Sequence, residues 1–353
     1  MRVPADILRP RALEAGDTVA LFSPSAGLAA RFPRAYEQGV GVLRHALGLK
    51  VRELETARAD GAWLRSHPQA RADDLHRAFR DPEVRAVFAT AGGEDVVRVL
   101  PYVDPGVFRG DPKILMATSD ATPLLALANQ AGLVTFHGPS VMSGLAQAGV
   151  VPTAFLAHVR ALLFGAPQVY EYQPYGAYLE RDPERASDAE PPRLREDHRG
   201  WRVVQGHGRV RGRLFGGGLE ALDLVKGSAY WPAPDFFDGR VLFLEVSKVS
   251  PGPEAVRRTL YGYGVQGLFD RIAGLLVGRP RGYDESQRDA LERELTEVVA
   301  GDFGCRDLPV MANVDCGRTD PQLIFPLGGL VEIDCEAKRL QLVESPVLPA
   351  AEG

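Results

Sequence analysis

Apolar runs alternate with amphipathic stretches along the first half of the chain. Segments of strand character fall at residues 17–23, 49–54, 84–90, 113–118 and 133–136. Apolar residues with helical spacing occur between them, at residues 31–47, 71–79 and 123–128. Strands that alternate with helices predict an α/β fold in which helices cover both faces of a parallel sheet.

The second half of the chain predicts a smaller, mixed α/β domain. Apolar strands are expected at residues 210–215, 240–245, 271–278 and 308–313, and helices at 254–261 and 285–299. Residues 330–334 and 339–343 have the pattern of a terminal β-hairpin. The predicted organisation is an N-terminal domain at 1–165, a linker or surface loop at 166–200 and a C-terminal domain at 201–353.

The loop at 166–200 combines tyrosines with proline, glycine and many charged residues, and it shows no apolar periodicity. Tyrosine rings stack on flat groups, so Tyr172 and Tyr175 are candidate substrate-binding residues. The alternative is an ordinary linker without a ligand.

Several small or polar residues follow directly after the predicted parallel strands. Ser23-Pro24-Ser25, Gly92-Gly93 and Ser119 all stand at carboxyl ends of strands. Ligands bind beyond these ends in open parallel sheets. We therefore expect the three positions to share one rim.

Ser119 occupies a corner between a buried strand and a helix. The first N–H groups of such a helix and its dipole stabilise developing negative charge, which makes Ser119 a candidate nucleophile. Taken alone, the stretch favours the alternative that Ser119 is a helix N-cap. Gly92-Gly93 could supply N–H groups to an oxyanion or form an ordinary turn. Glu245, at a strand end, is either an orienting acid or an ion-paired carboxylate.

Composition and motifs exclude several classes of function. The chain has 353 residues, 45% hydrophobic and 25% charged, as expected for a soluble globular protein of two domains. A net charge of -5 argues against nucleic-acid and membrane partners. Three cysteines without a CxxC pair, no apolar signal-peptide core and no run that could span a bilayer favour a cytoplasmic location.

No cofactor or metal is expected from the motifs. The seven histidines include no HExxH pattern and no cluster with cysteine. Gly262, Gly264 and Gly267 have the spacing of a dinucleotide-binding loop. They follow a helical stretch instead of a strand, which favours a helix end and a turn.

Several motifs, in order along nearly the whole chain, resemble the LD-carboxypeptidase family of serine peptidases, and in particular the branch of the microcin-C self-immunity peptidase. The motifs lie at residues 71–76, 91–93, 118–122, 136–139, 214–217, 242–245, 275–280 and 313–321. The resemblance implies a Rossmann-like N-terminal domain, a smaller C-terminal domain and a homodimer. It also implies a metal-free Ser-His-Glu triad that cleaves amides next to a free carboxylate or in peptidyl-nucleotides.

The resemblance assigns roles to matching residues. Ser119 would be the nucleophile and Glu245 the acid that orients the base. The N–H groups of Asp120 and of the Gly92-Gly93 turn would form the oxyanion hole.

The chain departs from the family at the base. Arg318 stands in the motif where the family carries the triad histidine, and an arginine stays protonated in proteins, so it cannot accept the proton of Ser119. His137 is not an obvious substitute, because its His-Gly-Pro motif occurs beside the usual triad in relatives. Gly218 stands where relatives usually carry asparagine.

Arg318 leaves three interpretations of the protein's function. In the favoured one, the chain is still a serine hydrolase or acyl-transfer enzyme that acts on an amide of a small peptide or aminoacyl conjugate. The substrate's amine or a water near Glu245 then takes the proton, and Arg318 binds an anionic group. The second is an inactive homologue that binds a small acidic or nucleotide-like peptide ligand, and the third is a feeble peptidase. Cys316 is an alternative nucleophile, although a buried, inert thiol is favoured there.

Overall fold

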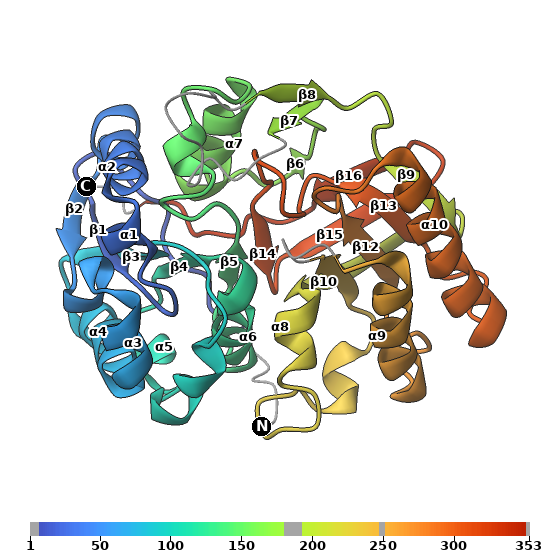
Figure 1. The fold of residues 1–353 in the computed structure, drawn as a ribbon, viewed down its shortest axis with the longest axis horizontal. Helices are drawn as coiled ribbons and strands as arrows, with labels where there is room; N and C mark the ends of the chain where they lie inside the picture. The colour runs from blue at the N-terminus through green and yellow to red at the C-terminus, as the bar shows by residue number, and fades with distance from the viewer. Residues whose placement is uncertain (1–6, 180–192, 247–250, 351–353) are drawn as a thin grey trace.

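The computed structural model describes residues 7–179, 193–246 and 251–350. Its two large β-sheets stand side by side, each with its own helices (Figure 1). The strands of the first sheet are β1 (Thr18–Phe22), β2 (Lys50–Glu53), β3 (Val84–Ala89), β4 (Ile114–Ala117), β5 (Thr135–His137) and β14 (Phe325–Leu327). Their order is β14-β5-β4-β3-β1-β2, and all neighbours pair in parallel except β14 with β5.

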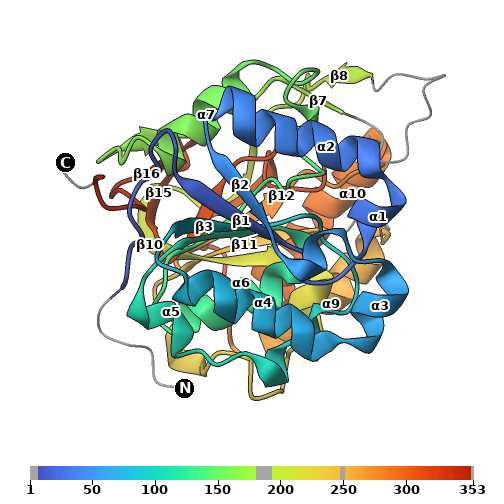
Figure 2. The ribbon, with the colours of Figure 1, turned by 90° about the vertical axis from the view of Figure 1, so that its left-hand side faces the viewer.

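Helices cover both faces of the first sheet, as the alternating pattern predicts. In Figure 2 the sheet lies between α2 and α7 on one side and α4, α5 and α6 on the other. The helices of this half are α1 (Leu28–Arg31), α2 (Pro33–Gly41), α3 (Gly61–Ser66), α4 (Pro68–Arg80), α5 (Val107–Gly110), α6 (Thr122–Gln130) and α7 (Ala154–Leu163). Because both faces are covered, the central strands are almost entirely apolar and buried.

The second sheet is mixed. Its strands are β6 (Tyr170–Glu171), β9 (Arg202–Gln205), β10 (Arg209–Gly218), β11 (Val241–Glu245), β12 (Gly274–Gly278), β13 (Val310–Val314), β15 (Leu330–Asp334) and β16 (Arg339–Leu342). The order is β6-β16-β15-β10-β11-β12-β13-β9, with β10 to β13 parallel. Its helices are α8 (Leu219–Asp223), α9 (Pro253–Val265) and α10 (Glu285–Thr296). The predicted terminal hairpin is confirmed by the antiparallel pairing of β15 with β16.

The structure corrects two details of the prediction. The helix expected at 31–47 is interrupted, because Pro33 begins a new helix and the last turn, residues 42–46, is a π-helix. The loop expected at 166–200 contains strands: β6 pairs with β16, and β7 (Ala177–Leu179) pairs with β8 (Leu194–Glu196). Most of its charged stretch, residues 180–192, lies outside the described residues.

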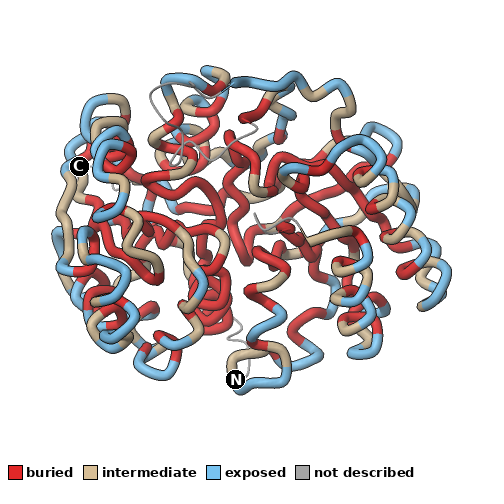
Figure 3. Tube along the Cα trace, in the orientation of Figure 1, coloured by how far each residue is buried: buried red, intermediate tan, exposed pale blue. Residues whose placement is uncertain are grey.

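The two halves share one continuous core. Buried segments run along both sheets (Figure 3), and their apolar side chains form a single cluster. Strand β14, late in the chain, returns to the first sheet and pairs with β5, while β6 joins the second. The glycine motif at 262–267 falls at the end of α9 and in the turn after it, as predicted. Within the described ranges, no helix is long and apolar enough to cross a membrane.

His158 on α7 ties the tyrosine segment to the chain before β14. Its Nε2 accepts a hydrogen bond from the backbone N–H of Ile324 at 2.7 Å, and its Nδ1 lies 2.7 Å from the hydroxyl of Tyr170. Burial lowers the pKa of His158 from 6.5 to about 3. The folded protein therefore holds this ring neutral.

The neutral His158 predicts a loss of stability in mild acid. Between pH 6.5 and about 3 the unfolded chain binds a proton at His158 that the folded chain does not. The free energy of unfolding should therefore fall by about 1.4 kcal/mol per pH unit from this residue alone. Denaturant titrations at pH 6 and pH 5 measure the decline. His158→Gln, which does not titrate, should show a decline shallower by about this amount, and equal declines would contradict the prediction.

Candidate active site

Ser119 sits in a strained corner directly after β4. It begins a 3-10 turn, Ser119–Ala121, that leads into α6, and its φ is +59°. A left-handed conformation costs a non-glycine residue about 1–2 kcal/mol. Such a strand-to-helix turn holds a nucleophilic serine exposed above the sheet in α/β-hydrolases. Thr118 and Ala121 occupy the cap positions of the turn and of α6. The N-cap interpretation of Ser119 is therefore wrong.

The Ser119 corner is joined to the second sheet through Thr122. Its hydroxyl donates to the carbonyl of Ser119 at 2.6 Å and accepts from the N–H of Gly218 at 2.9 Å. A Cβ at Gly217 would lie 2.4 Å from the Thr122 side chain, and the φ of Gly217 is +142°. Only glycine at this position allows β10 to approach the corner so closely.

The Gly92-Gly93 turn lies against Ser119. A Cβ at Gly92 would be 2.9 Å from the Cβ of Ser119, and one at Gly93 would be 2.0 Å from the hydroxyl of Ser25. In the part of the chain that the structure describes, the N–H groups of Gly92, Gly93 and Asp120 have no hydrogen-bond acceptor. Three donors of the corner and of the turn beside it are thus uncommitted. Asp120 is buried and the two glycines are half-buried, so these donors are open to a ligand oxygen.

Glu245 ends β11 and is almost completely buried, with 1% of its side chain exposed. Its Oε2 lies 2.7 Å from Nε2 of His137, and its Oε1 lies 3.3 Å from Nε of Arg318. A carboxylate removed from water needs partners, and a basic side chain faces each of its two oxygens, although neither contact has hydrogen-bond geometry. The structure thus brings Glu245 and Arg318 together, as an ion pair in which the arginine side chain is 12% exposed.

His137 is a site residue to which the sequence assigned no role. It ends β5, pairs in register with Ala117 of β4, and places its ring edge-on against Phe243 of β11. One feature of the sequence could have identified His137. It ends the strand that follows the Ser119 strand and helix along the chain, so the two strand ends were expected to be neighbours. Its Nε2 faces Glu245, so the ring is a partner of the carboxylate.

Gln322 connects the loop that carries Ser119 with the loop that carries Arg318. Its amide nitrogen donates to the carbonyl of Gly317 at 2.5 Å, and its amide oxygen accepts from the hydroxyl of Thr118 at 3.4 Å. Gly317 and Thr118 directly precede Arg318 and Ser119 in the chain. One buried side chain therefore fixes both loops relative to each other.

Two further groups have shifted pKa values. Burial raises the pKa of Asp120, whose carboxylate accepts a hydrogen bond from the N–H of Val96 at 3.0 Å. Burial, together with the charge of Glu245, raises the pKa of the Cys316 thiol well above its usual value, which favours the inert interpretation of this cysteine. The described ranges contain no group of three or more histidine, cysteine, aspartate or glutamate residues that could hold a metal.

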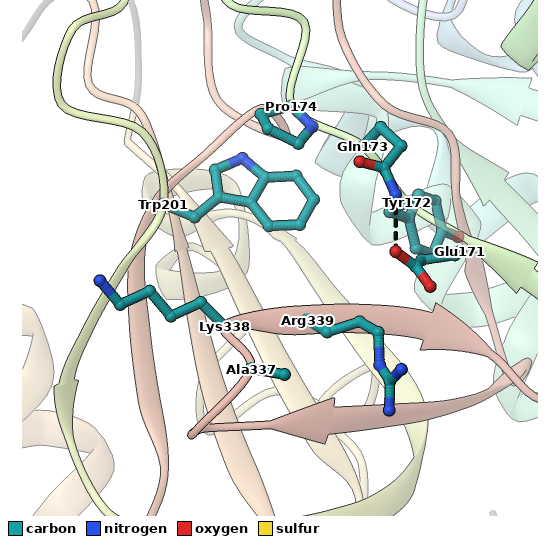
Figure 4. A pocket seen from close by; sticks show the side chains of 8 residues that line it. All are labelled: Glu171, Tyr172, Gln173, Pro174, Trp201, Ala337, Lys338 and Arg339. Atoms are coloured by element: carbon teal, nitrogen blue, oxygen red, sulfur yellow. Dashed lines mark hydrogen bonds between the residues drawn. The ribbon is translucent and has the colours of Figure 1, made fainter.

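The two candidate tyrosines support the loop after Arg318. The hydroxyl of Tyr172 donates to the carbonyl of Ile324 at 3.0 Å, and that of Tyr175 donates to the carbonyl of Gln322 at 3.4 Å. Tyr172 also borders a cavity of about 440 Å³ (Figure 4). Its other lining residues are Glu171, Gln173, Pro174, Trp201, Ala337, Lys338 and Arg339. Their contact with a substrate stays a prediction.

Comparison with known proteins identifies the family to which the chain belongs. Residues 19–138, which include Ser119, match the LD-carboxypeptidase N-terminal domain. Residues 211–333, which include Glu245 and Arg318, match the LD-carboxypeptidase C-terminal domain. The chain belongs to the LD-carboxypeptidase family. The family predicted from the sequence is confirmed.

Several members of the family match this chain over nearly its full length. The microcin C7 self-immunity protein MccF of Escherichia coli is 27% identical over 346 residues, which cover 94% of this chain and 94% of that protein. An MccF-like protein from Bacillus anthracis has a crystal structure with a TM-score of 0.83 and 25% identity, covering 96% of this chain and 99% of that one. MccF in complex with aspartyl sulfamoyl adenosine has a TM-score of 0.82 and 24% identity, covering 97% and 100%. The predicted fold class is confirmed.

The close approach at Gly217 makes a testable prediction about stability. Gly217→Ala combines a clash with Thr122 and a left-handed backbone, so it should destabilise the protein by at least about 2 kcal/mol. Gly149→Ala is the matched control, because a Cβ there meets nothing within 4 Å and its φ is not left-handed. Urea denaturation compares the two variants. Equal midpoints would show that the contact between the sheets does not require glycine.

Proposed function

We propose that the protein is a serine acyl-transfer enzyme of LD-carboxypeptidase type that acts on an amide of a small peptide or aminoacyl conjugate. The observation that carries the proposal is the strained Ser119 with the three uncommitted N–H groups of Gly92, Gly93 and Asp120 around it. A strained backbone costs stability and is found where a reaction uses it. Donors left free beside the strained residue are what a developing oxyanion needs.

The acylation step follows from these groups. The Ser119 oxygen attacks the amide carbon, and the carbonyl oxygen becomes an oxyanion held by the three N–H groups. The C–N bond then breaks, an ester to Ser119 forms, and the amine leaves with a proton. Water or another nucleophile subsequently cleaves the ester and returns the proton to Ser119.

The proton of Ser119 needs an acceptor other than Arg318. In this proposal Arg318 replaces the histidine of the family, and its guanidinium has no free lone pair. His137 is engaged with Glu245 at 2.7 Å. The substrate's own amine therefore takes the proton, or a water relays it to the carboxylate of Glu245. Where the amine is the acceptor, Glu245 supports the positive charge that forms on it.

Arg318 has a second part in the proposal. Its Nε lies 3.3 Å from Glu245, which leaves the terminal nitrogens of the fork for an anionic group of the substrate. The ligands named for two MccF structures, aspartyl sulfamoyl adenosine and glutamyl sulfamoyl guanosine, carry an acidic aminoacyl group joined to a nucleoside. We propose an acidic conjugate of this class as the substrate of this chain.

The second candidate is an inactive homologue that binds a small acidic or nucleotide-like peptide ligand. The ion pair of Arg318 with Glu245 favours it, because a group that cannot accept a proton occupies the partner position of the orienting acid. Binding would then survive Ser119→Ala.

Product release from a small panel of substrates decides between these candidates. The panel holds an LD-tetrapeptide, an aminoacyl sulfamoyl nucleoside and acidic dipeptides, and mass spectrometry detects the products. We expect turnover by the natural sequence and at least about a 10³-fold loss in Ser119→Ala. No turnover by the natural sequence, with activity gained in Arg318→His, would instead establish a binding protein on a peptidase fold. Slow turnover that Arg318→His raises strongly would indicate a residual peptidase.

The role of Arg318 in anion binding predicts a selective effect of Arg318→Lys. Lysine keeps the positive charge beside Glu245 but lacks the planar fork. The KM for substrates with an acidic aminoacyl group should rise by about 10-fold, whereas that for neutral amides stays within about 2-fold. Initial-rate measurements on matched aspartyl and asparaginyl substrates test this. An equal change for both substrates would contradict anion binding by Arg318.

A further inference from the structure

The turn that follows Gly92 and Gly93 is held in place from three directions. The hydroxyl of Ser25 accepts hydrogen bonds from the N–H groups of Glu94 and Asp95, at 3.0 and 3.2 Å. The carboxylate of Asp120 accepts from the N–H of Val96 at 3.0 Å. The amides of residues 94, 95 and 96 are thus all committed, which leaves those of Gly92 and Gly93 for a ligand.

The third anchor is Arg71, in the first turn of α4. Its side chain is completely buried, and its guanidinium donates to the carbonyl of Pro24 at 2.8 Å. It also donates to both carboxylate oxygens of Asp95, at 2.8 and 3.3 Å. One planar group therefore connects the end of β1 with the turn after β3, and such a fork holds an orientation that a single charge would not.

Asp95 is the charged partner of the Arg71 guanidinium. Its carboxylate also accepts a hydrogen bond from the hydroxyl of Ser25 at 3.1 Å. Burial opposes ionisation of Asp95, but the guanidinium of Arg71 and this hydroxyl outweigh it and lower the pKa. Arg98 approaches the same carboxylate at 3.4 Å from a side chain that is 48% exposed. Arg71 is thus the buried partner of Asp95, and Arg98 is the exposed one.

We propose that Arg71 is a positioning residue for the oxyanion site: through Asp95 and Pro24 it fixes the turn that presents the N–H groups of Gly92 and Gly93 to the carbonyl attacked by Ser119. This inference rests on the proposed function. Donors aimed in advance at the developing charge lower the barrier because they need not reorganise during the reaction. A small rotation of the turn would misdirect both donors while leaving the substrate's other contacts intact.

Steady-state kinetics of Arg71→Lys test the proposal, with Arg98→Lys as the matched control. Lysine keeps the charge beside Asp95 but cannot hold Asp95 and Pro24 in one plane. We expect kcat to fall about 10²-fold or more while KM changes less than about 3-fold, because donors to the oxyanion act mainly in the transition state. Arg98→Lys should leave both constants within about 2-fold of the natural sequence. A KM increase without a loss of kcat, or equal effects of the two substitutions, would overturn the proposal.

Amide hydrogen exchange tests the positioning role of Arg71 even if the protein shows no turnover. Amide hydrogen exchange of a peptide covering residues 90–98 should become at least about 10-fold faster in Arg71→Lys, while peptides from the second sheet are unchanged. Unchanged exchange at 90–98 would overturn the inference. If Arg71→Lys does not fold, Asp95→Asn replaces it, since the Asp95 side chain is 23% exposed and keeps its shape.

The two proposals fail in different ways. If the natural sequence shows no turnover that depends on Ser119, the proposed function fails, and the kinetic comparison moves to the Arg318→His background. A loss of kcat from adding Arg71→Lys to that active variant would support the positioning role. Full activity of the double variant would overturn it.

Discussion

A carboxylate with 1% of its side chain exposed is the constraint on which the rest of the site depends. An isolated charge at that depth is very costly, so Glu245 requires both of its partners. They come from different parts of the molecule: His137 ends β5 of the first sheet, and Arg318 follows β13 of the second. Bringing both side chains to one buried carboxylate therefore requires that the two sheets meet at their carboxyl ends. The site is a product of that contact.

The contact between the sheets is built from small residues and buried hydrogen bonds. Gly217 admits the side chain of Thr122, whose hydroxyl joins the Ser119 corner to β10. Gln322 then bridges the loops of Ser119 and Arg318, and β14 follows it into the first sheet. If one half moved relative to the other, several of these hydrogen bonds would break together. The bonds therefore hold the geometry around Ser119.

The sequence predicted the elements well because their patterns are local. Alternating strands and helices, the strand-end position of Ser119 and the match of Glu245 to a family motif can each be read from a short window. The strand β14 and the contact of His137 with Glu245 could not, because both depend on how two sheets are placed side by side. Pro33 indicates a break in the helix from the sequence alone, but the apolar periodicity around it favoured one long helix. The predicted domain boundaries and the roles of the site residues stay predictions.

In the proposed function, Arg318 in place of the family's histidine would change which molecule sets the protonation of the reaction. In a serine triad the base belongs to the protein, and its ionisation controls the rate. A guanidinium has no free lone pair with which to accept that proton. If the amine of the substrate accepts the proton, the pH dependence follows that amine, which for an α-amino group lies near about 7.7–8.0. Such an enzyme would discriminate between substrates by basicity as well as by shape, and amides without a nearby amine would bind without reacting. An inactive binding protein would make no such distinction. In the proposed function, Arg318 would therefore limit which substrates react, while the groups around Ser119 would act as they do with a histidine base.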